Sequence, residues 1–384
     1  MPALEVLVVG GGVIGAATAY ALARRGRRVL LLEQFTIGHA RGSSHGLSRS
    51  ISSVHSRLHH MRLVAAARQA WRRLEDDSGQ RLLIKTGVLD IGHADSPAIQ
   101  ASIAHLGAVD EEVEILGLYE LRARFPQLAL TDKTIAIYQP EGGILPASRC
   151  VATLVEQARR YGAKVAVGVR VSRIKPEGSG VRVDADGTVY WAQRAVIAAG
   201  SYSSVLLQHL DVAVDLSTTC EQVAFFSPRH RVLSKLGYLP VVRDYGHHPG
   251  DHLLVCYPDL GEGVKVERYG AGIPVADPYE PPPLPDPVEN ERIAQRLAQT
   301  MPGFANQVLY AETCRFTHTP DGDFVIDTHP EYNQILIAIP GSSCGFSVAP
   351  IVGEILSDLA MHGTTSYDIA PFRLARLHRI GRMS

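Results

Sequence analysis

The N-terminal segment LEVLVVGGGVIG, residues 4–15, joins a short apolar run to a glycine-rich turn. The run Leu4–Val9 is almost continuously apolar, which predicts a strand buried on both faces of a sheet. Residues 16–25 have helical composition without a breaker, and Gly26 ends that helix. A second buried strand follows at Val29–Glu33. The segment therefore predicts a βαβ unit, with a parallel strand pair and a right-handed crossover.

The glycines of the turn stand where a bound dinucleotide requires them. Gly10 allows the tight turn, Gly12 lets the backbone approach a pyrophosphate, and Gly15 lets the helix pack on the strand. The phosphates then meet the free amides of the helix N-terminus. Glu33, at the end of the second strand, can accept hydrogen bonds from an adenosine ribose, and its charge would repel a 2′-phosphate. The motif alone does not choose between NAD and FAD, and such glycines also occur in purely structural turns.

The composition is that of a globular protein. The chain has 384 residues, 46% of them hydrophobic and 20% charged, and a net charge of −1. The length suggests two domains, and the charge removes the basic field that nucleic acid or an anionic membrane would need. No apolar run approaches the ~18 residues of a membrane span, and the N-terminus predicts a strand rather than a signal peptide. The five cysteines form no C-x-x-C pair, so we expect a reducing, cytoplasmic location without disulfides or a zinc knuckle.

Hydrophobic periodicity and turn residues predict the remaining elements. We expect helices at residues 61–76, 111–124, 148–161, 289–299 and 349–361. We expect strands at 82–91, 136–139, 164–171, 180–183, 195–198, 323–327 and 334–339, and a β-rich stretch from 221 to 269. A proline cluster at 277–287 predicts an exposed connection. The order indicates a mixed α/β fold: a Rossmann-like domain, discontinuous in sequence, with an inserted β-rich substrate domain.

The segment GSSHGLSR, residues 42–49, favours a flavin over a nicotinamide. A small, hydroxyl-rich loop with one histidine and one arginine shortly after the ribose carboxylate is unusual in NAD dehydrogenases. It suits a chain running along the flavin, where Arg49 could stabilise negative charge on the reduced ring. The alternative is a solvated turn.

Motifs along the whole chain resemble monomeric sarcosine oxidase and N-methyltryptophan oxidase, within the D-amino-acid-oxidase-like flavoproteins. They occur in family order: GGGVIG with Glu33, GSSHGxSR, KTGVL at 85–89, AVIAAG at 195–200, GVK at 263–265, CxFTxTPD at 314–321, FVID at 324–327 and PGSSCGF at 340–346. The resemblance implies an FAD-binding domain formed by residues 1–85, 148–215 and 317–384. Residues 86–147 and 216–316 would then form the substrate domain.

The resemblance also implies which residues bind FAD. They come from the glycine turn, the ribose carboxylate, the hydroxyl-rich loop, two later strands and the C-terminal motif: Gly10, Gly12, Val13, Ile14, Gly15, Glu33, Gln34, Ser43, Ser44, Arg49, Val171, Ala199, Gly200, Cys314, Gly341, Gly345, Phe346 and Ser347.

Two of the carried-over positions matter most for chemistry. The family attaches FAD covalently through a cysteine at the position of Cys314, although a single cysteine is more often a small buried hydrophobe. Lys265 stands where the family keeps a lysine over the flavin face, and an ammonium there would stabilise the charge that develops on O₂. The chain has only six lysines, which favours this reading over a surface charge. The other catalytic candidates are His45, Arg49 and Tyr269.

The departures from the sarcosine oxidase pattern concern the substrate. Ser52 and Ser347 replace an arginine and a lysine that would clamp the substrate carboxylate. Phe316 replaces a tyrosine, Tyr269 replaces a histidine, and Val255 stands near another tyrosine position. A carboxylate without these cations would lose ~2–5 kcal/mol, so sarcosine is not the expected substrate. A replacement cation would have to come from elsewhere: Arg57, Arg268 or Arg315.

No metal site is expected. The segment His247–His252 contains metal-binding residue types, but its spacing through a Pro-Gly loop matches no helical or strand ligand pair.

The resemblance implies an FAD-dependent amine oxidase that converts a secondary, N-methyl type amine or amino acid to an imine and reduces O₂ to hydrogen peroxide. The expected partners are the small amine and O₂, with no nucleic acid or membrane, and the expected state is a monomer or weak dimer. Three alternatives remain open: a dehydrogenase with another acceptor, a tailoring oxidase for a larger natural-product amine, and a non-catalytic flavin subunit.

Overall fold

The computed structural model describes residues 4–246, 250–341 and 343–380. The first three residues of the His247–His252 segment lie outside this part of the chain. Among the described residues, no helix is both long and apolar enough to span a membrane.

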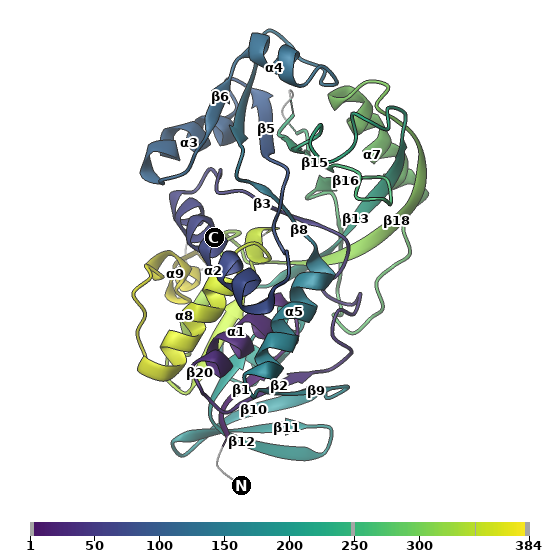
Figure 1. The fold of residues 1–384 in the computed structure, drawn as a ribbon. Helices are drawn as coiled ribbons and strands as arrows, with labels where there is room; N and C mark the ends of the chain where they lie inside the picture. The colour runs from purple at the N-terminus through teal and green to yellow at the C-terminus, as the bar shows by residue number, and fades with distance from the viewer. Residues whose placement is uncertain (1–3, 247–249, 342, 381–384) are drawn as a thin grey trace.

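The lower part of the molecule in Figure 1 is built on one mixed sheet. Its parallel centre places β1 between β12 and β2, with β9 beyond β2 and β20 beyond β12. Antiparallel strands extend it: β10 and β11 beside β12, and β19 beside β20. The bounds are β1 Leu4–Val9, β2 Val29–Glu33, β9 Lys164–Val167, β10 Val171–Glu177, β11 Gly180–Ala185, β12 Thr188–Ile197, β19 Val325–Thr328 and β20 Ile335–Ile339.

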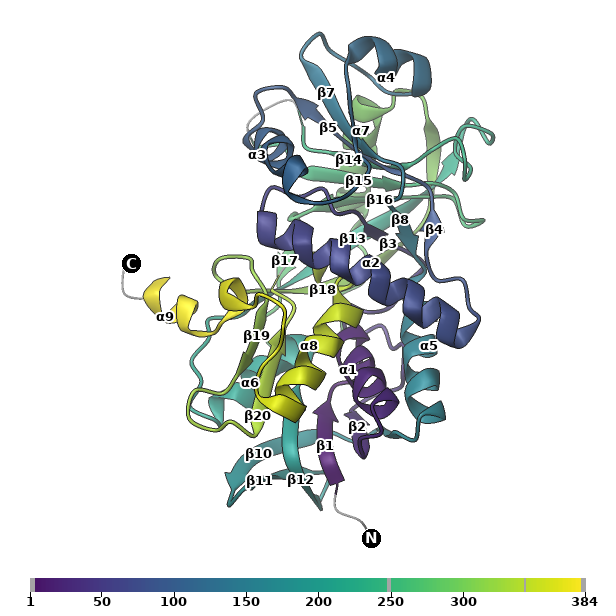
Figure 2. The ribbon, with the colours of Figure 1, turned by 60° about the vertical axis from the view of Figure 1, so that its left-hand side comes forward.

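Helices cover one face of this sheet (Figure 2). They are α1 Val13–Arg24, α2 Leu58–Ser78, α5 Ala147–Arg160 and α8 Ala349–His362. The residues of α1 from Val13 to Ala23 are all buried, and Gly353 of α8 lies against the backbone of Ala17 too closely for any side chain. The predicted βαβ unit is therefore present, with its helix sandwiched between sheet and helices. The other face of the sheet packs on α6 Ser203–Gln208 and α9 Ala375–Ile380.

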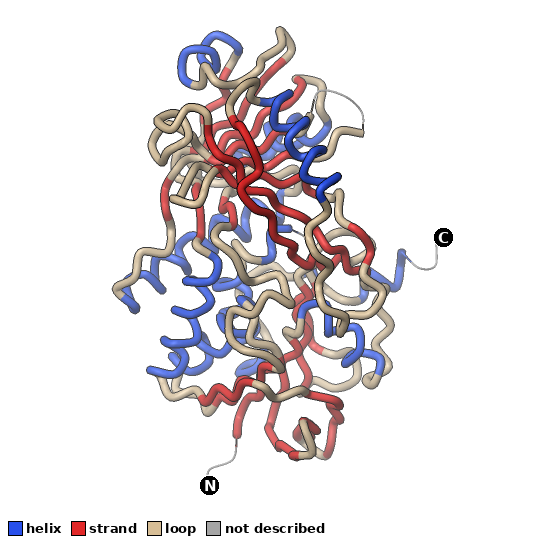
Figure 3. The backbone as a smooth tube through the Cα atoms, turned by 90° about the vertical axis from the view of Figure 1, so that its right-hand side faces the viewer, coloured by secondary structure: helices blue, strands red, loops and turns tan. Residues whose placement is uncertain are grey.

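A second, largely antiparallel sheet forms the upper part, and its long strands extend toward the middle of the molecule in Figure 3. Its order is β17-β13-β16-β15-β14-β5-β7-β6, with β18 also paired to β13. The bounds are β5 Val88–His93, β6 Glu114–Leu116, β7 Thr134–Gln139, β13 Ser217–Pro228, β14 Val241–Asp244, β15 Leu253–Tyr257, β16 Val264–Tyr269, β17 Ile273–Pro274 and β18 Ala305–His318. Its helices are α3 Pro97–His105, α4 Leu118–Arg124 and α7 Pro287–Thr300. A small sheet of β3 Arg49–Ile51, β8 Gly143–Leu145 and β4 Ile84–Lys85 lies between the two.

The predicted elements are confirmed with three exceptions. The helix expected at 111–124 is wrong in its first half, because Glu114–Leu116 pairs with β7 and only Leu118–Arg124 is helical. The strand expected at 82–91 is interrupted at Gly87, and the strand expected at 164–171 is interrupted at Gly168. Both glycines have positive φ, +71° and +69°, which a continuous strand does not allow. Helix α3 was not predicted. It begins at Pro97, a residue type suited to the first helical turn.

Candidate active site

A large cavity, about 1320 Å³ with the space at its open mouth included, lies at the carboxyl ends of β1 and β2. This edge of a parallel sheet is where open α/β folds bind ligands. Most of the residues predicted to bind the cofactor line it: Gly10, Gly12, Val13, Ile14, Glu33, Gln34, Ser43, Ser44, Arg49, Val171, Ala199, Gly200, Gly345 and Phe346.

The glycine turn forms one wall of this cavity. Gly10 has a φ of +106° and lies against the carbonyl of Ala198, while a Cβ on Gly15 would overlap the carbonyl oxygen of Gly10. Gly12, at the start of α1, lines the cavity, and a Cβ there would crowd the side chain of Ser44, whose Oγ would lie at 3.2 Å. The N-terminus of α1, the positive end of its dipole, thus faces the cavity, as the binding of a pyrophosphate requires.

Glu33 places a charged carboxylate in the same cavity. Burial raises its pKa, but hydrogen bonds from His39 and from the amides of Phe35 and Gly11 outweigh burial and hold the pKa below its ordinary value. The amide contacts are 2.8 Å from Phe35 N to Oε1 and 2.6 Å from Gly11 N to Oε2. The carboxylate is therefore ionised at neutral pH, as hydrogen bonding to ribose hydroxyls requires.

A smaller cavity of about 360 Å³ adjoins the first, because Arg49 and Phe316 line both. Lys265 of β16 and Cys314 of β18 come together here with His45. Arg49 Nη2 lies 3.2 Å from Cys314 Sγ, and Lys265 Nζ donates to the carbonyl of Ser48 at 3.0 Å. The site thus combines buried Lys265 and half-buried Arg49 with one thiol, one imidazole and three carboxyl groups, those of Glu221, Glu267 and Glu312.

Burial sets the protonation of these groups. It lowers the pKa of Lys265 to about 8, partly opposed by the charge of Glu267, so most of the ammonium remains protonated at pH 7. It also lowers the pKa of His45 to about 4, helped by the charge of Arg49, so this imidazole is neutral. Burial raises the pKa of the Cys314 thiol, which Arg49 and Lys265 oppose.

The remaining predicted residues lie outside both cavities. Gly341 has a φ of +54° and lies against the backbone of Asp323, and Ser347 Oγ donates to the carbonyl of Cys344 at 2.8 Å. The ring of Tyr269 lies 5.7 Å from that of Phe316 but lines neither cavity. Its catalytic role stays a prediction.

Residues 5–359 match the protein family described as FAD dependent oxidoreductase (DAO). The chain belongs to this family. It is 33% identical to peroxisomal sarcosine oxidase of Homo sapiens, over 98% of this chain and 97% of that one. It is 28% identical to N-methyl-L-tryptophan oxidase of Salmonella typhimurium, over 97% and 98%. NikD, an amino acid oxidase of nikkomycin biosynthesis, has a similar structure, with a TM-score of 0.85, 25% identity and coverage of 97% and 98%.

The residues present fit FAD. Gly12 lines the cavity at the N-terminus of α1, where a pyrophosphate would bind, and Glu33 presents the carboxylate for the ribose. His45 Nε2 is buried in the smaller cavity and has no hydrogen-bond partner among the residues that the structure describes. Such an orphaned atom is expected where a ligand completes the site. The protein is an FAD-dependent oxidoreductase related to sarcosine oxidases.

None of the arginines considered as a replacement for the carboxylate clamp is free. Arg57 pairs with Asp323 at 2.8 Å, and Arg268 pairs with Glu289 at 2.9 Å. Arg315 donates to the carbonyls of Pro278 and Glu280. These contacts hold each guanidinium in the framework.

A cation that the sequence reasoning missed lies beside Ser52. Arg243 Nη2, on β14, lies 3.3 Å from Ser52 Oγ and 2.7 Å from Asp90 Oδ2. Arg243 and Asp90 are both buried, so Asp90 offsets the charge that Arg243 brings to this position. The only sequence signal is an arginine inside the apolar run of a strand, which predicts a buried ion pair without naming its partner.

The Arg243–Asp90 pair predicts a stability effect. We expect Arg243→Met to lower the free energy of unfolding by about 3–5 kcal/mol, because it leaves Asp90 as a buried charge without its partner. The double variant Arg243→Met with Asp90→Asn should recover much of this loss. Denaturant unfolding of the wild type and of both variants measures these free energies. Equal losses in the single and double variants would contradict the assignment of Arg243 and Asp90 as a buried ion pair.

Proposed function

We propose that this protein is an amine oxidase that converts a secondary, N-methyl type amine to an imine, with FAD attached covalently through Cys314 and O₂ reduced to hydrogen peroxide. The observation that carries the proposal is the meeting of Lys265, Arg49 and Cys314 at the junction of the two cavities. The relatives named for sarcosine and N-methyltryptophan support the same class of substrate.

When bound, FAD supplies the two-electron chemistry, taking hydride equivalents from the carbon beside the amine nitrogen and passing electrons to O₂. The protein's own residues would bind the cofactor and place charge around it. The N-terminus of α1 would bind the pyrophosphate, and the carboxylate of Glu33 would bind the ribose. Lys265, which is buried, and Arg49, which is half-buried, would place positive charge where negative charge develops during electron transfer. Neutral His45 can donate or accept a hydrogen bond there without adding charge.

We propose that residues 1–85, 148–215 and 317–384 form the FAD-binding domain and that residues 86–147 and 216–316 form the substrate domain. The strands of the lower sheet all come from the first set. In the upper sheet, β18 extends past the boundary at 316 to His318, which carries Cys314 toward the FAD-binding side.

The substrate pocket predicts little preference for a carboxylate. Ser52 and Ser347 supply no cation, and the charge of Arg243 is offset by Asp90. We therefore expect kcat/KM for N-methyltryptamine to equal or exceed that for N-methyltryptophan, which differs by the carboxylate. Peroxide production under air measures both.

A preference of tenfold or more for N-methyltryptophan would contradict this prediction, because that ratio needs a cation on the carboxylate worth about 1.4 kcal/mol. If neither amine produces peroxide but either one reduces the flavin anaerobically, the protein is a dehydrogenase with another acceptor.

A further inference from the structure

Cys344 differs from the other cysteines of the chain. It lies in the turn at Ser343–Gly345 and is partly exposed, whereas the other four are buried. Burial raises the pKa of each of those four thiols: Cys150, Cys220, Cys256 and Cys314. The surroundings of Cys344 act in the opposite direction.

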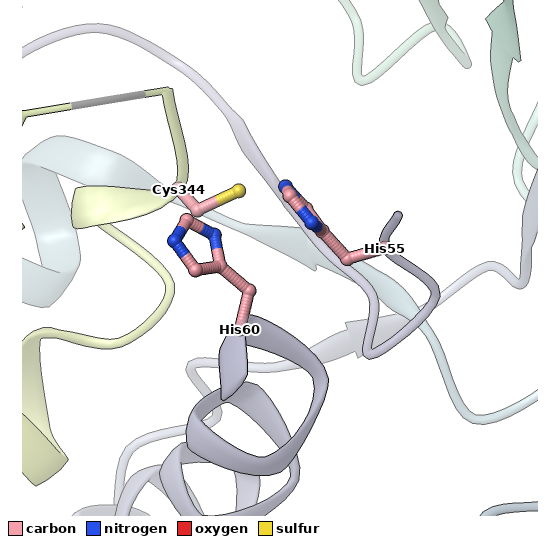
Figure 4. A group of neighbouring side chains, drawn as sticks. All are labelled: His55, His60 and Cys344. Atoms are coloured by element: carbon pink, nitrogen blue, oxygen red, sulfur yellow. The ribbon is translucent and has the colours of Figure 1, made fainter. Parts of the chain in front are cut away.

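Two histidines surround its sulfur (Figure 4). His55 lies in the loop between β3 and α2, and His60 lies in the first turn of α2. One nitrogen of each ring and Cys344 Sγ lie within 4.8 Å of one another, and the sulfur points toward both rings. Three polar side chains from separate segments therefore converge on one point.

Asp323 fixes the proton of His60. His60 is 1% exposed, and its Nε2 hydrogen-bonds to Asp323 Oδ1. Arg57 and His59 contact the same carboxylate, at 2.8 and 3.0 Å. Burial raises the pKa of Asp323, but its hydrogen bonds to His59 and His60 outweigh burial and keep it ionised. A charged carboxylate on Nε2 favours the imidazolium form of His60, whose other N–H then points toward the sulfur.

A backbone amide fixes the proton of His55. The N–H of Arg57 donates to His55 Nδ1 at 3.0 Å, so neutral His55 carries its proton on Nε2. A metal ion would need a lone pair on that atom, which the tautomer does not offer. The cluster therefore presents two N–H donors to Cys344 rather than a set of metal ligands.

The charge balance around the sulfur favours the thiolate. Burial raises the pKa of Cys344, but the neighbouring imidazoles of His55 and His60 outweigh burial and hold the pKa well below that of an ordinary thiol. Arg243 and Tyr245 also interact electrostatically with Cys344. Arg243 is cationic, and Tyr245 is neutral because burial raises the pKa of its phenol.

We propose that Cys344 is a modification site: a thiolate, held between His55 and His60, that hydrogen peroxide oxidises to a sulfenic acid. The sulfur attacks one peroxide oxygen, an S–O bond forms, and the O–O bond breaks. The sulfur loses two electrons, and the departing hydroxide takes the proton of the His60 imidazolium to form water. The inference rests on the proposed oxidase function, because that activity would supply the peroxide within the protein itself. Gly345 and Phe346 line the main cavity, so the oxidised residue lies beside the cofactor site.

The rate of alkylation of Cys344 by iodoacetamide tests the thiolate. Peptide mass spectrometry of the holoenzyme would give this rate at Cys344 between pH 6 and 8.5. We expect the rate constant to change less than about twofold, whereas an ordinary thiol of pKa about 8.5 would gain roughly 150-fold over this range. An increase of that size would overturn the proposal.

Neighbouring histidines supply a matched pair of variants. His59 and His60 both bond to Asp323, but only His60 acts on Cys344. We expect His60→Asn to restore a steep pH dependence of alkylation and His59→Asn to change it little. Equal behaviour of the two variants would contradict the role of His60, and the wild-type profile decides the matter if either variant fails to fold.

Added peroxide tests the modification independently of turnover. With no amine present, we expect H₂O₂ followed by dimedone to label Cys344, and Cys344→Ser to lose that label. Labelling together with failed amine oxidation would refute the proposed function and leave this inference standing. If Cys344 stays unlabelled, or if Zn²⁺ binds at micromolar concentration and blocks its alkylation, the inference is wrong and the cluster is inert or a metal site.

Discussion

Lys265→Met is expected to slow reoxidation of the reduced flavin by O₂ about 100- to 1000-fold, the cost typical of removing one preorganised charge from an active site. Lys265 is buried, and its ammonium lies 3.0 Å from the carbonyl of Ser48 and 4.4 Å over the ring of Tyr257. The rate of anaerobic flavin reduction by the amine should change only a few-fold, because the Lys265 ammonium acts on the reaction with oxygen. Stopped-flow absorbance of the flavin separates the two half-reactions.

The ammonium also predicts a pH dependence. Lys265 is cationic below its pKa of about 8 and neutral above it, so the O₂ rate should fall as pH rises through 8 and be highest below it. Lys85→Met is the control, since Lys85 is exposed, pairs with Glu141 and lines neither cavity. If Lys265→Met slows both half-reactions equally, or if the control variant loses as much of its rate with O₂, Lys265 has no specific role in the reaction with oxygen.

Cys314→Ser is expected to abolish covalent attachment of the flavin. Acid precipitation of the wild-type enzyme should leave the flavin with the protein, and the same treatment of the variant should release essentially all of it. The physical basis is the position of Cys314 in the cavity that adjoins the main one, with Arg49 Nη2 3.2 Å from its sulfur.

Cys220→Ser provides the matched control. Cys220 lies on β13, which pairs with β18, but lines neither cavity. This control should keep the flavin attached. Release of flavin from the wild type, or retention by Cys314→Ser, would show that Cys314 is not the attachment site.

Local pattern was sufficient for the nucleotide-binding half of the fold. The apolar run at Leu4–Val9, the glycine spacing and the carboxylate of Glu33 are neighbours in sequence, and each follows from short-range chemistry. The failed prediction at 111–124 shows the limit of such patterns. Glu114–Leu116 is a strand because β7 provides its hydrogen bonds, and that pairing is tertiary.

The rest of the site depends on contacts between distant segments. Lys265 reaches Ser48, and Arg49 reaches Cys314, so only the family resemblance could place them together from sequence. The position of Arg243 beside Ser52 could not be predicted in this way, because an ion pair buried between strands has no characteristic spacing in the sequence. The same holds for Cys344 and its two histidines, whose protons are set by Asp323 and by one backbone amide.

The most direct test of the central claim is an anaerobic titration of the purified enzyme with a secondary N-methyl amine, followed by admission of O₂. The account predicts loss of the oxidised flavin absorbance near 450 nm on addition of amine. It then predicts full recovery on aeration, with one hydrogen peroxide formed per flavin and formaldehyde released from the N-methyl group. A flavin that no secondary amine reduces, or that recovers in air without peroxide, would contradict the assignment of this protein as an amine oxidase.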